Sequence, residues 1–180
     1  MVLLIRWHQM ITPVIQTLVD AGWELLSYAS PDFKRRIQTP IAPIGEELST
    51  VPRYGVPAEI ADAIAAAGYD RCSTASNHTY DRGTTGIDRT VEVLTAAGLG
   101  QSGMARTPAE ITPQLFEVDG VTVSHLSYTF SYNGLSLPTD QQWRSALIDV
   151  ERIVADATWA RAIGANVVIA SLHWGAEGSH

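Results

Sequence analysis

The stretch Ser76-Asn77-His78-Thr79-Tyr80-Asp81-Arg82-Gly83 is the part of this sequence from which a fold and a site can be argued. It follows a short run of apolar and small residues, Tyr69 to Ala75, that predicts a strand, and it precedes a segment with helical spacing. In open α/β sheets, ligands bind at the carboxyl end of a strand, where the chain turns into a helix. The octet therefore predicts either a ligand site or, more simply, an Asn-His turn that caps the next helix.

Three side chains of this stretch have the chemistry of a ligand site. Asn77 offers an amide oxygen and His78 an imidazole nitrogen, a pair suited to a divalent metal ion or a phosphate group. Asp81 is placed to orient His78 or to approach a metal through a water molecule. We expect His78 and Asp81 to be catalytic if the site is that of an enzyme.

Composition limits the class of protein. A chain of 180 residues with 46% hydrophobic and 17% charged residues suits one folded domain. The net charge of −7 argues against extensive contact with nucleic acid, which requires a basic surface. Cys72 is the only cysteine, so no internal disulfide is possible, and its place in the predicted strand favours a buried, small apolar role.

The first 37 residues differ from the rest of the chain. They carry a net charge of +1 against −8 for residues 38–180, which predicts a boundary near residue 37. A helix is predicted over 11–19 and a short strand over 23–28, followed by a small basic cluster at 34–36 that suits a solvated loop or an acidic partner. No apolar run approaches the roughly 18 residues of a membrane span, and no signal peptide is recognised, so a cytoplasmic location is the default expectation.

Beyond residue 37 the pattern alternates between helices and strands. Asp119-Gly120 between two alternating apolar runs is the strongest hairpin signal in the chain. His125 shares a strand face with valines, which favours a hydrogen-bonded core histidine. Residues 129–138 are predicted to form a long loop near the site, with the composition of a lid. The predicted elements are a loop over 39–55, helices over 57–68, from 85 and over 149–163, and strands over 69–75, 99–103, 115–118, 121–128 and 167–172.

A second histidine follows the most apolar strand. His173 comes directly after Val167–Leu172, just as His78 follows Tyr69–Ala75. If both strands belong to one parallel sheet, their carboxyl ends lie at the same edge and the two imidazoles converge. Asn77, His78 and His173 would then supply the three ligands that a metal site requires, with Glu177 and His180 as further candidates. The alternative is that His173 is only a strand-end residue beside a packing tryptophan.

Two motifs together resemble those of a known family. The octet resembles the Asn-His-x-x-Asp-x-Gly signature of the CapA family of poly-γ-glutamate capsule biosynthesis proteins. Leu172-His173-Trp174-Gly175-Ala176-Glu177 resembles that family's His-Trp-Gly-x-Glu signature, and the order and separation of the two motifs also fit. The segment from Thr39 to Pro57 is similar to the family's loop before the first repeated helix, so the resemblance covers about residues 37–180.

The resemblance implies a fold and a chemistry. It implies an α/β protein with a calcineurin-like metallophosphatase fold, a four-layer αββα sandwich that would be incomplete here. It implies a divalent metal (Mn, Zn or Fe, and a dinuclear pair in a full-length relative). By this resemblance His173 is a metal ligand, Asn77 and His78 are metal ligands or phosphate contacts, and Asp81 lies behind them. The resemblance also implies a role in capsule or poly-γ-glutamate biosynthesis, and the substrate would be a small molecule or an anionic polymer. Full-length relatives would be membrane-associated or exported.

The sequence also departs from the family pattern. A Gly-Asp motif that would bring a metal-binding aspartate is not found in residues 1–37, and Gln38 stands where the family carries a glutamate. A further Gly-His-x-x-His segment that completes the family's metal site is not found either. These departures predict a partial CapA-like domain over 38–180 after an atypical segment over 1–37, with weak metal binding because carboxylate ligands are scarce.

Three functions are compatible with the sequence. The first is a metal-dependent hydrolase resembling phosphatases, with His78, His173 and Asp81 as the catalytic residues. The second is a binding or assembly component of anionic-polymer export, in which the same pocket recognises its ligand without turnover. The third is an inactive fragment with an exposed sheet edge, which would favour aggregation.

Overall fold

The computed structural model describes residues 2–5, 20, 24–27 and 39–174. Within these ranges the chain alternates between short strands and helices of eight to fourteen residues. The strands are β1 (Val2–Ile5), β2 (Glu24–Ser27), β3 (Arg71–Ser73), β4 (Gly100–Ser102), β5 (Leu115–Val118), β6 (Val121–Thr129) and β7 (Val167–His173). The helices are α2 (Glu59–Ala66), α3 (Gly83–Ala96), α4 (Val150–Ala162) and the single 3₁₀ turn η2 (Gln142–Arg144).

The strands form two separate sheets. The larger has the order β2-β1-β7-β6-β5 and is parallel except for β5, which pairs antiparallel with β6. The smaller contains only β3 and β4, which pair in parallel. Two of the parallel pairs are connected by a helix, because parallel strands require a crossover: α3 lies between β3 and β4, and α4 lies between β6 and β7.

The prediction that the strands before His78 and His173 share one sheet is wrong. His78 follows β3 in the small sheet, whereas His173 is the last residue of β7 in the large sheet. The amphipathic pattern of a strand indicates that it is half buried, but it does not specify which strand it pairs with. Here Cys72 pairs with Gln101 of β4, and none of the described strands of the large sheet forms a backbone ladder with β3.

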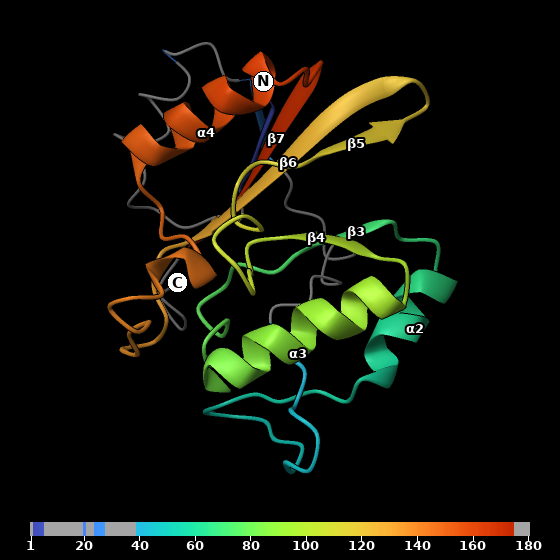
Figure 1. Cartoon of the computed structure of the whole chain (residues 1–180), viewed down its shortest axis with the longest axis vertical. Coiled ribbons are helices and arrows are strands. Elements are labelled where there is room, and N and C mark those ends of the chain that lie inside the picture. Colours follow the sequence, from blue (N-terminus) through green and yellow to red (C-terminus); the bar gives the residue numbers. More distant parts are fainter. Residues whose placement is uncertain (1, 6–19, 21–23, 28–38, 175–180) are drawn as a thin grey trace.

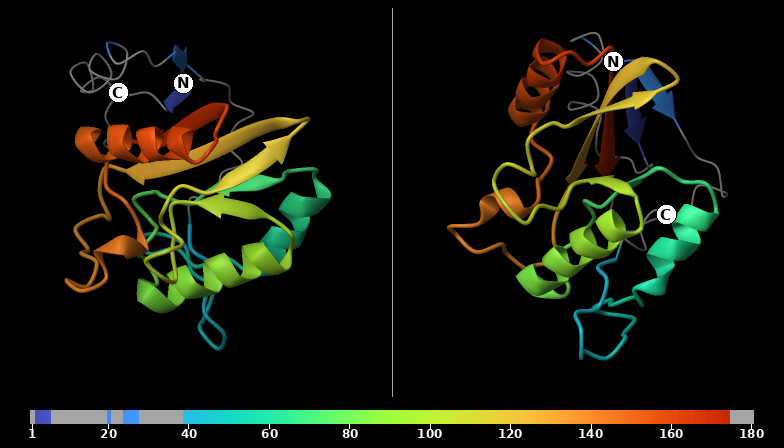
Figure 2. Two further views of the ribbon diagram at one scale, coloured as in Figure 1. Left: turned by 45° about the horizontal axis from the view of Figure 1, so that its top comes forward. Right: turned by 45° about the vertical axis from the view of Figure 1, so that its right-hand side comes forward.

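The two sheets are stacked, with helices on the outer face of each (Figures 1 and 2). Helix α4 covers one face of the large sheet, and the small sheet lies against its other face. Helices α2 and α3 cover the outer face of the small sheet, so the layers run helix, sheet, sheet, helix. Each outer layer has its own apolar core: Ile153, Ala157 and Ala160 of α4 pack on β6 and β7, and Leu94 of α3 packs with Cys72 of β3.

Polar side chains join the two sheets. The hydroxyl groups of Ser73 and Ser127 lie 2.7 Å apart, and the Ser102 hydroxyl donates a hydrogen bond of 2.5 Å to the carbonyl of His125. The imidazole Nε2 of His125 is 2.9 Å from the hydroxyl of Ser171 on the neighbouring strand. His125 is therefore a half-buried, hydrogen-bonded residue between the sheets, which agrees with its predicted structural role.

Most predicted elements are present, with small changes at their ends. The hairpin is confirmed, with Asp119 and Gly120 at φ of 48° and 78° in a two-residue turn between β5 and β6. Helix α3 begins at Gly83 rather than near Thr85, and the pattern Thr85-x-x-Asp88, which resembles a capping box, does not form one. The Thr85 hydroxyl donates back to the carbonyl of Arg82, and the Asp88 carboxylate pairs with Arg144 instead.

The first 37 residues contribute two strands to the large sheet. The predicted strand over 23–28 is found as β2, and β1, which the sequence did not predict, pairs with both β2 and β7. The predicted helix over 11–19, the basic cluster at 34–36, Gln38, Glu177 and His180 lie outside the described residues. Among the residues that the structure describes, no helix combines the length and the apolar character needed to cross a membrane.

Candidate functional site

The octet begins with a turn that its own side chains close. The hydroxyl of Thr79 accepts a hydrogen bond of 2.8 Å from the backbone N–H of Ser76 and donates one of 2.9 Å to the carbonyl of Thr74. The hydroxyl of Ser76 in turn accepts the backbone N–H of His78 at 3.1 Å. Thr79 and Ser76 are buried, so the turn is held rigidly and the side chain of His78 is fixed in direction.

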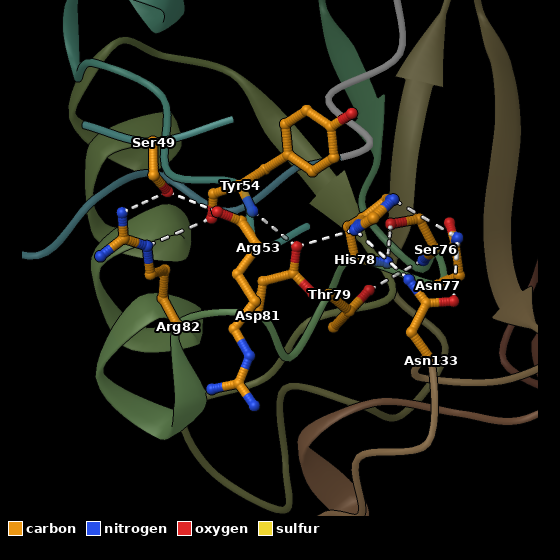
Figure 3. Close-up of polar contacts among 10 residues, drawn as sticks. All are labelled: Ser49, Arg53, Tyr54, Ser76, Asn77, His78, Thr79, Asp81, Arg82 and Asn133. Atoms are coloured by element: carbon orange, nitrogen blue, oxygen red, sulfur yellow. Dashed lines mark hydrogen bonds and ion pairs between the residues drawn. The ribbon is translucent and has the colours of Figure 1, made fainter. Parts of the chain in front are cut away.

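His78 is hydrogen-bonded to Asp81, three residues further along the chain. The imidazole Nδ1 lies 2.7 Å from Asp81 Oδ2, and the exposed fractions of the two side chains are only 11% and 2%. The same carboxylate oxygen accepts the backbone N–H of Tyr54 at 2.8 Å, as Figure 3 shows. With a neutral imidazole, Nδ1–H donates to Asp81 and Nε2 keeps its lone pair, which is the form of histidine that binds a metal or accepts a proton.

Two asparagines from different loops meet at the imidazole. The amide Nδ2 of Asn77 lies 3.4 Å from His78 Nε2 and donates a hydrogen bond of 3.1 Å to Asn133 Oδ1. The Asn133 amide nitrogen lies 3.4 Å from His78 Nδ1. Because a 180° rotation of an amide exchanges its oxygen and nitrogen, the Asn77 side chain can turn either a donor or an acceptor toward the point that Nε2 faces.

Asn133 and Tyr54 are site residues that the sequence reasoning missed. Asn133 and Gly134, at φ of 52° and 79°, form a tight turn closed by a 2.9 Å hydrogen bond from the N–H of Leu135 to the carbonyl of Tyr132. The Asn-Gly pair signalled this turn, and the prediction that the 129–138 loop lies near the site is confirmed. Tyr54 places its ring edge-on to the His78 ring, with centroids 4.6 Å apart, and no sequence signal indicated that contact.

A pocket of about 320 Å³ opens beside His78. Its size lies at the lower end of the range for small-molecule sites, about 300 to 1,000 Å³. Two loops form its walls, and the His78–Asp81 couple lies between them. The lining residues are Val51, Pro52, Arg53 and Tyr54 from one loop, Asn133 and Leu135 from the other, and His78 and Asp81.

The loop Val51–Tyr54 is attached to the octet by Arg82. The guanidinium of Arg82 donates to the carbonyls of Tyr54 and Glu47 at 3.2 and 2.7 Å and to the hydroxyl of Ser49 at 2.6 Å. It also forms an ion pair of 2.8 Å with the carboxylate of Glu46. Five N–H donors in a planar fork make these simultaneous bonds possible. The octet therefore both supplies the imidazole and holds the opposite wall of the pocket.

His173 is connected to the His78 pocket through the loop after β6. It is a half-buried residue at the end of β7, and its carbonyl accepts a hydrogen bond of 2.9 Å from the N–H of Phe130. Asn133, which contacts His78, is only three residues further along that loop, a reach of at most about 11 Å. A metal site formed by Asn77, His78 and His173 therefore stays a prediction. It would lie at the edge of the molecule to which both stacked sheets contribute.

The described residues fit a metal ion only in part. Nε2 of His78, supported by a carboxylate behind the ring, is a good nitrogen ligand, and the Asn77 amide lies beside it. No group of three His, Cys, Asp or Glu side chains that could hold a metal occurs within the described part of the chain. Any metal held here would therefore need ligands such as Asn77 and His173 in addition to His78.

The fold and the site define a mixed α/β protein with a buried histidine–aspartate couple beside a pocket at the ends of two stacked sheets. Residues 36–180 match the family model described as bacterial capsule synthesis protein PGA_cap. The match covers most of the chain, and the protein belongs to this family. The comparison with curated proteins gives no match. The family membership suspected from the two sequence signatures is thus confirmed.

Proposed function

We propose that this chain is a hydrolase of the calcineurin-like metallophosphatase type that acts in capsule synthesis and uses the pocket beside His78 as its active site. The observation that carries the proposal is the buried His78–Asp81 couple, which opens on a pocket of about 320 Å³. The order of layers, helix, sheet, sheet, helix, supports the four-layer αββα fold that the sequence resemblance implies. The family membership supports the link to capsule synthesis.

In this proposal Asn77, His78 and His173 hold a divalent metal ion, Mn, Zn or Fe. A bound divalent ion, or a pair, polarises a phosphoryl or acyl group and lowers the pKa of bound water. Asp81 keeps the His78 ring in one orientation and one tautomer, and the N–H of Tyr54 in turn holds Asp81. The amides of Asn77 and Asn133 provide donors at the pocket edge to which a substrate oxygen can bind.

Metal binding tests the proposed site directly. Calorimetric titration of the protein with Mn²⁺ and with Zn²⁺ should show saturable binding. This binding should be lost in His78→Ala and in His173→Ala. His125→Gln is the matched control, because it replaces a half-buried imidazole that lies between the sheets and contacts Ser171 rather than the pocket. Thermal melts of each variant show whether it is folded. Unchanged metal affinity in folded His78→Ala would refute the site.

A second candidate is a binding component that recognises an anionic polymer without turnover. It is favoured by the finding that the described residues contain no cluster of three strong metal ligands. Assays with a phosphate ester and with a γ-glutamyl amide, each with added Mn²⁺ or Zn²⁺, separate the two functions. Turnover that depends on His78 identifies the hydrolase, and ligand binding without turnover identifies the binding component.

A further inference from the structure

We propose that Arg53 makes this pocket a recognition site for an anionic group, a carboxylate or a phosphate carried on an apolar stem. The inference deepens the proposed function and rests on it for the identity of the pocket. Arg53 lies in the pocket wall beside Val51 and Pro52, and Leu135 is in the opposite wall. No sequence motif pointed to Arg53, because it belongs to a loop far from the octet in the chain.

In the part of the chain that the structure describes, the pocket lining contains one positively charged and one negatively charged side chain, and only the negative one is already bonded. Among the described residues that line the pocket, Arg53 is the only one with a cationic side chain, and Asp81 is the only one with a carboxylate. Asp81 is 2% exposed, and its Oδ2 is already bonded to His78 and to the N–H of Tyr54. Within the described part of the chain no carboxylate pairs with Arg53, whose side chain is exposed. The positive charge of Arg53 is therefore not paired directly with a carboxylate of the described residues.

The net charge of the protein makes this local cation necessary. At −7 the chain as a whole repels anions, and the His78–Asp81 couple contributes one negative charge when its imidazole is neutral. Arg53 brings the formal charge of the lining to zero, and the amides of Asn133 and Asn77 add neutral donors. Arg53 therefore offsets the negative charge that an anion would otherwise meet in this pocket.

The backbone around Arg53 is held in place although its side chain is free to move. Its carbonyl accepts a hydrogen bond from the hydroxyl of Ser49, which is itself bonded to Arg82. The next residue, Tyr54, is fixed at its N–H by Asp81 and at its carbonyl by Arg82. A rigid backbone that presents one long, charged side chain is the arrangement expected of a recognition residue.

The orientation of Arg53 sets the mode of binding. Figure 3 shows its side chain running past Asp81, with the guanidinium directed away from His78. Because exposed side chains change rotamer within nanoseconds, a ligand anion can draw the guanidinium over the pocket, and the contact must offset the entropy of ordering this side chain. Its planar fork binds both carboxylate and phosphate in a bidentate manner. The apolar side chains of Val51, Pro52 and Leu135 suit the stem that carries the anionic group.

Anion titrations of the metal-free protein test this inference. The probes are inorganic phosphate and a linear pentamer of glutamate, each titrated in the presence of a chelator and followed by calorimetry and NMR. The wild type should bind at least one probe, and the preferred probe identifies the phosphate or the carboxylate source. Arg53→Gln should weaken that binding about tenfold or more, because one charge-assisted bidentate contact is lost. Arg53→Lys should restore part of it.

Arg106→Gln is the matched control, since it removes the same charge from an exposed ion pair with Glu110 outside the pocket. Equal weakening by Arg53→Gln and Arg106→Gln, or no saturable binding of either probe by the wild type, would overturn the inference. Metal titration of the same variants keeps the two proposals apart. Anion binding that depends on Arg53 in a protein that binds no metal would refute the hydrolase and leave the anion site standing.

Discussion

The residues of the octet, 76–83, have different structural roles in the site. Ser76 and Thr79 use their hydroxyl groups to close the turn, and Asp81 uses one carboxylate oxygen to hold both the His78 ring and the Tyr54 backbone. Arg82 holds the facing loop. Of these residues, His78 and Asp81 line the pocket, and the hydrogen bonds of the others keep the His78 ring and the facing loop in place.

Cys72 provides a pH-dependent prediction at the residue scale. Burial in the core between α2, α3 and β3 raises the pKa of its thiol to about 11, although the nearby Arg71 opposes the shift. In the unfolded chain a thiol ionises at about pH 8.5. Because the folded pKa is the higher one, the free energy of unfolding is unaffected below that pH and should fall as pH rises through this window toward 11.

Urea unfolding between pH 8 and pH 10.5 measures this effect. Cys72→Ala is the matched variant: it starts less stable because it leaves a small cavity, but it should lose less free energy over the same pH range. The buried Tyr128 and Tyr132, whose pKa values are raised by burial, contribute equally to both proteins. Identical pH slopes in the two proteins would show that the thiol does not titrate differently in the two states.

Among the elements, the loop over residues 39–56 shows how an irregular segment is given a fixed shape. It has no helix or strand of its own, but Ile41 is buried and its N–H donates to the hydroxyl of Thr90 in α3 at 2.9 Å. Further along, the Arg82 guanidinium lies so close to Gly55 that an added Cβ would come within 2.5 Å of it. The loop is therefore shaped around α3 and the residue that precedes it.

Arg82→Lys should loosen this loop without unfolding the protein. A single ammonium group cannot reproduce the fork that reaches Glu46, Glu47, Ser49 and Tyr54, so two or more hydrogen bonds of about 1 kcal/mol each are lost. We expect hydrogen–deuterium exchange of residues 46–56 to rise roughly tenfold or more. Arg89→Lys, which alters an ion pair with Glu92 on α3, is the control. Equal exchange in both variants would contradict the role of Arg82.

At the scale of the whole molecule, the two sheets meet through hydroxyl groups and a histidine rather than through an apolar core alone. The pocket depends on this contact, because His78 follows β3 of the small sheet while Asn133 follows β6 of the large one. A shift of one sheet over the other would separate these side chains. The contact between Ser73 and Ser127 should therefore contribute to both stability and the geometry of the site.

A double-mutant cycle measures that contribution. Ser73→Ala and Ser127→Ala should each lower the free energy of unfolding, and their coupling energy should be about 0.5 to 1.5 kcal/mol, the net value of one hydrogen bond within a protein. Ser73→Ala combined with the exposed Ser136→Ala should be additive within error and serves as the control. A coupling energy of zero for the first pair would mean that the sheets are not joined at this point.

The sequence by itself determined the elements that local patterns encode. The two-residue turn at Asp119-Gly120, the buried face of α4 and the strand over 167–172 follow from turn chemistry and hydrophobic periodicity. The two signatures also identified the family, because they preserve residue types at fixed spacing. Each of these features depends on neighbours close in the chain, and such information can be obtained from one sequence.

Only the tertiary structure decided which strands pair and which loops surround the imidazole. The pattern of β3 is compatible with either sheet, and its place beside β4 results from how α3 and the large sheet pack around it. Arg53, Tyr54 and Asn133 reach the pocket from loops that lie more than twenty residues from His78 in the chain. Contacts across such separations depend on the packing of the whole chain, so no local pattern predicts them.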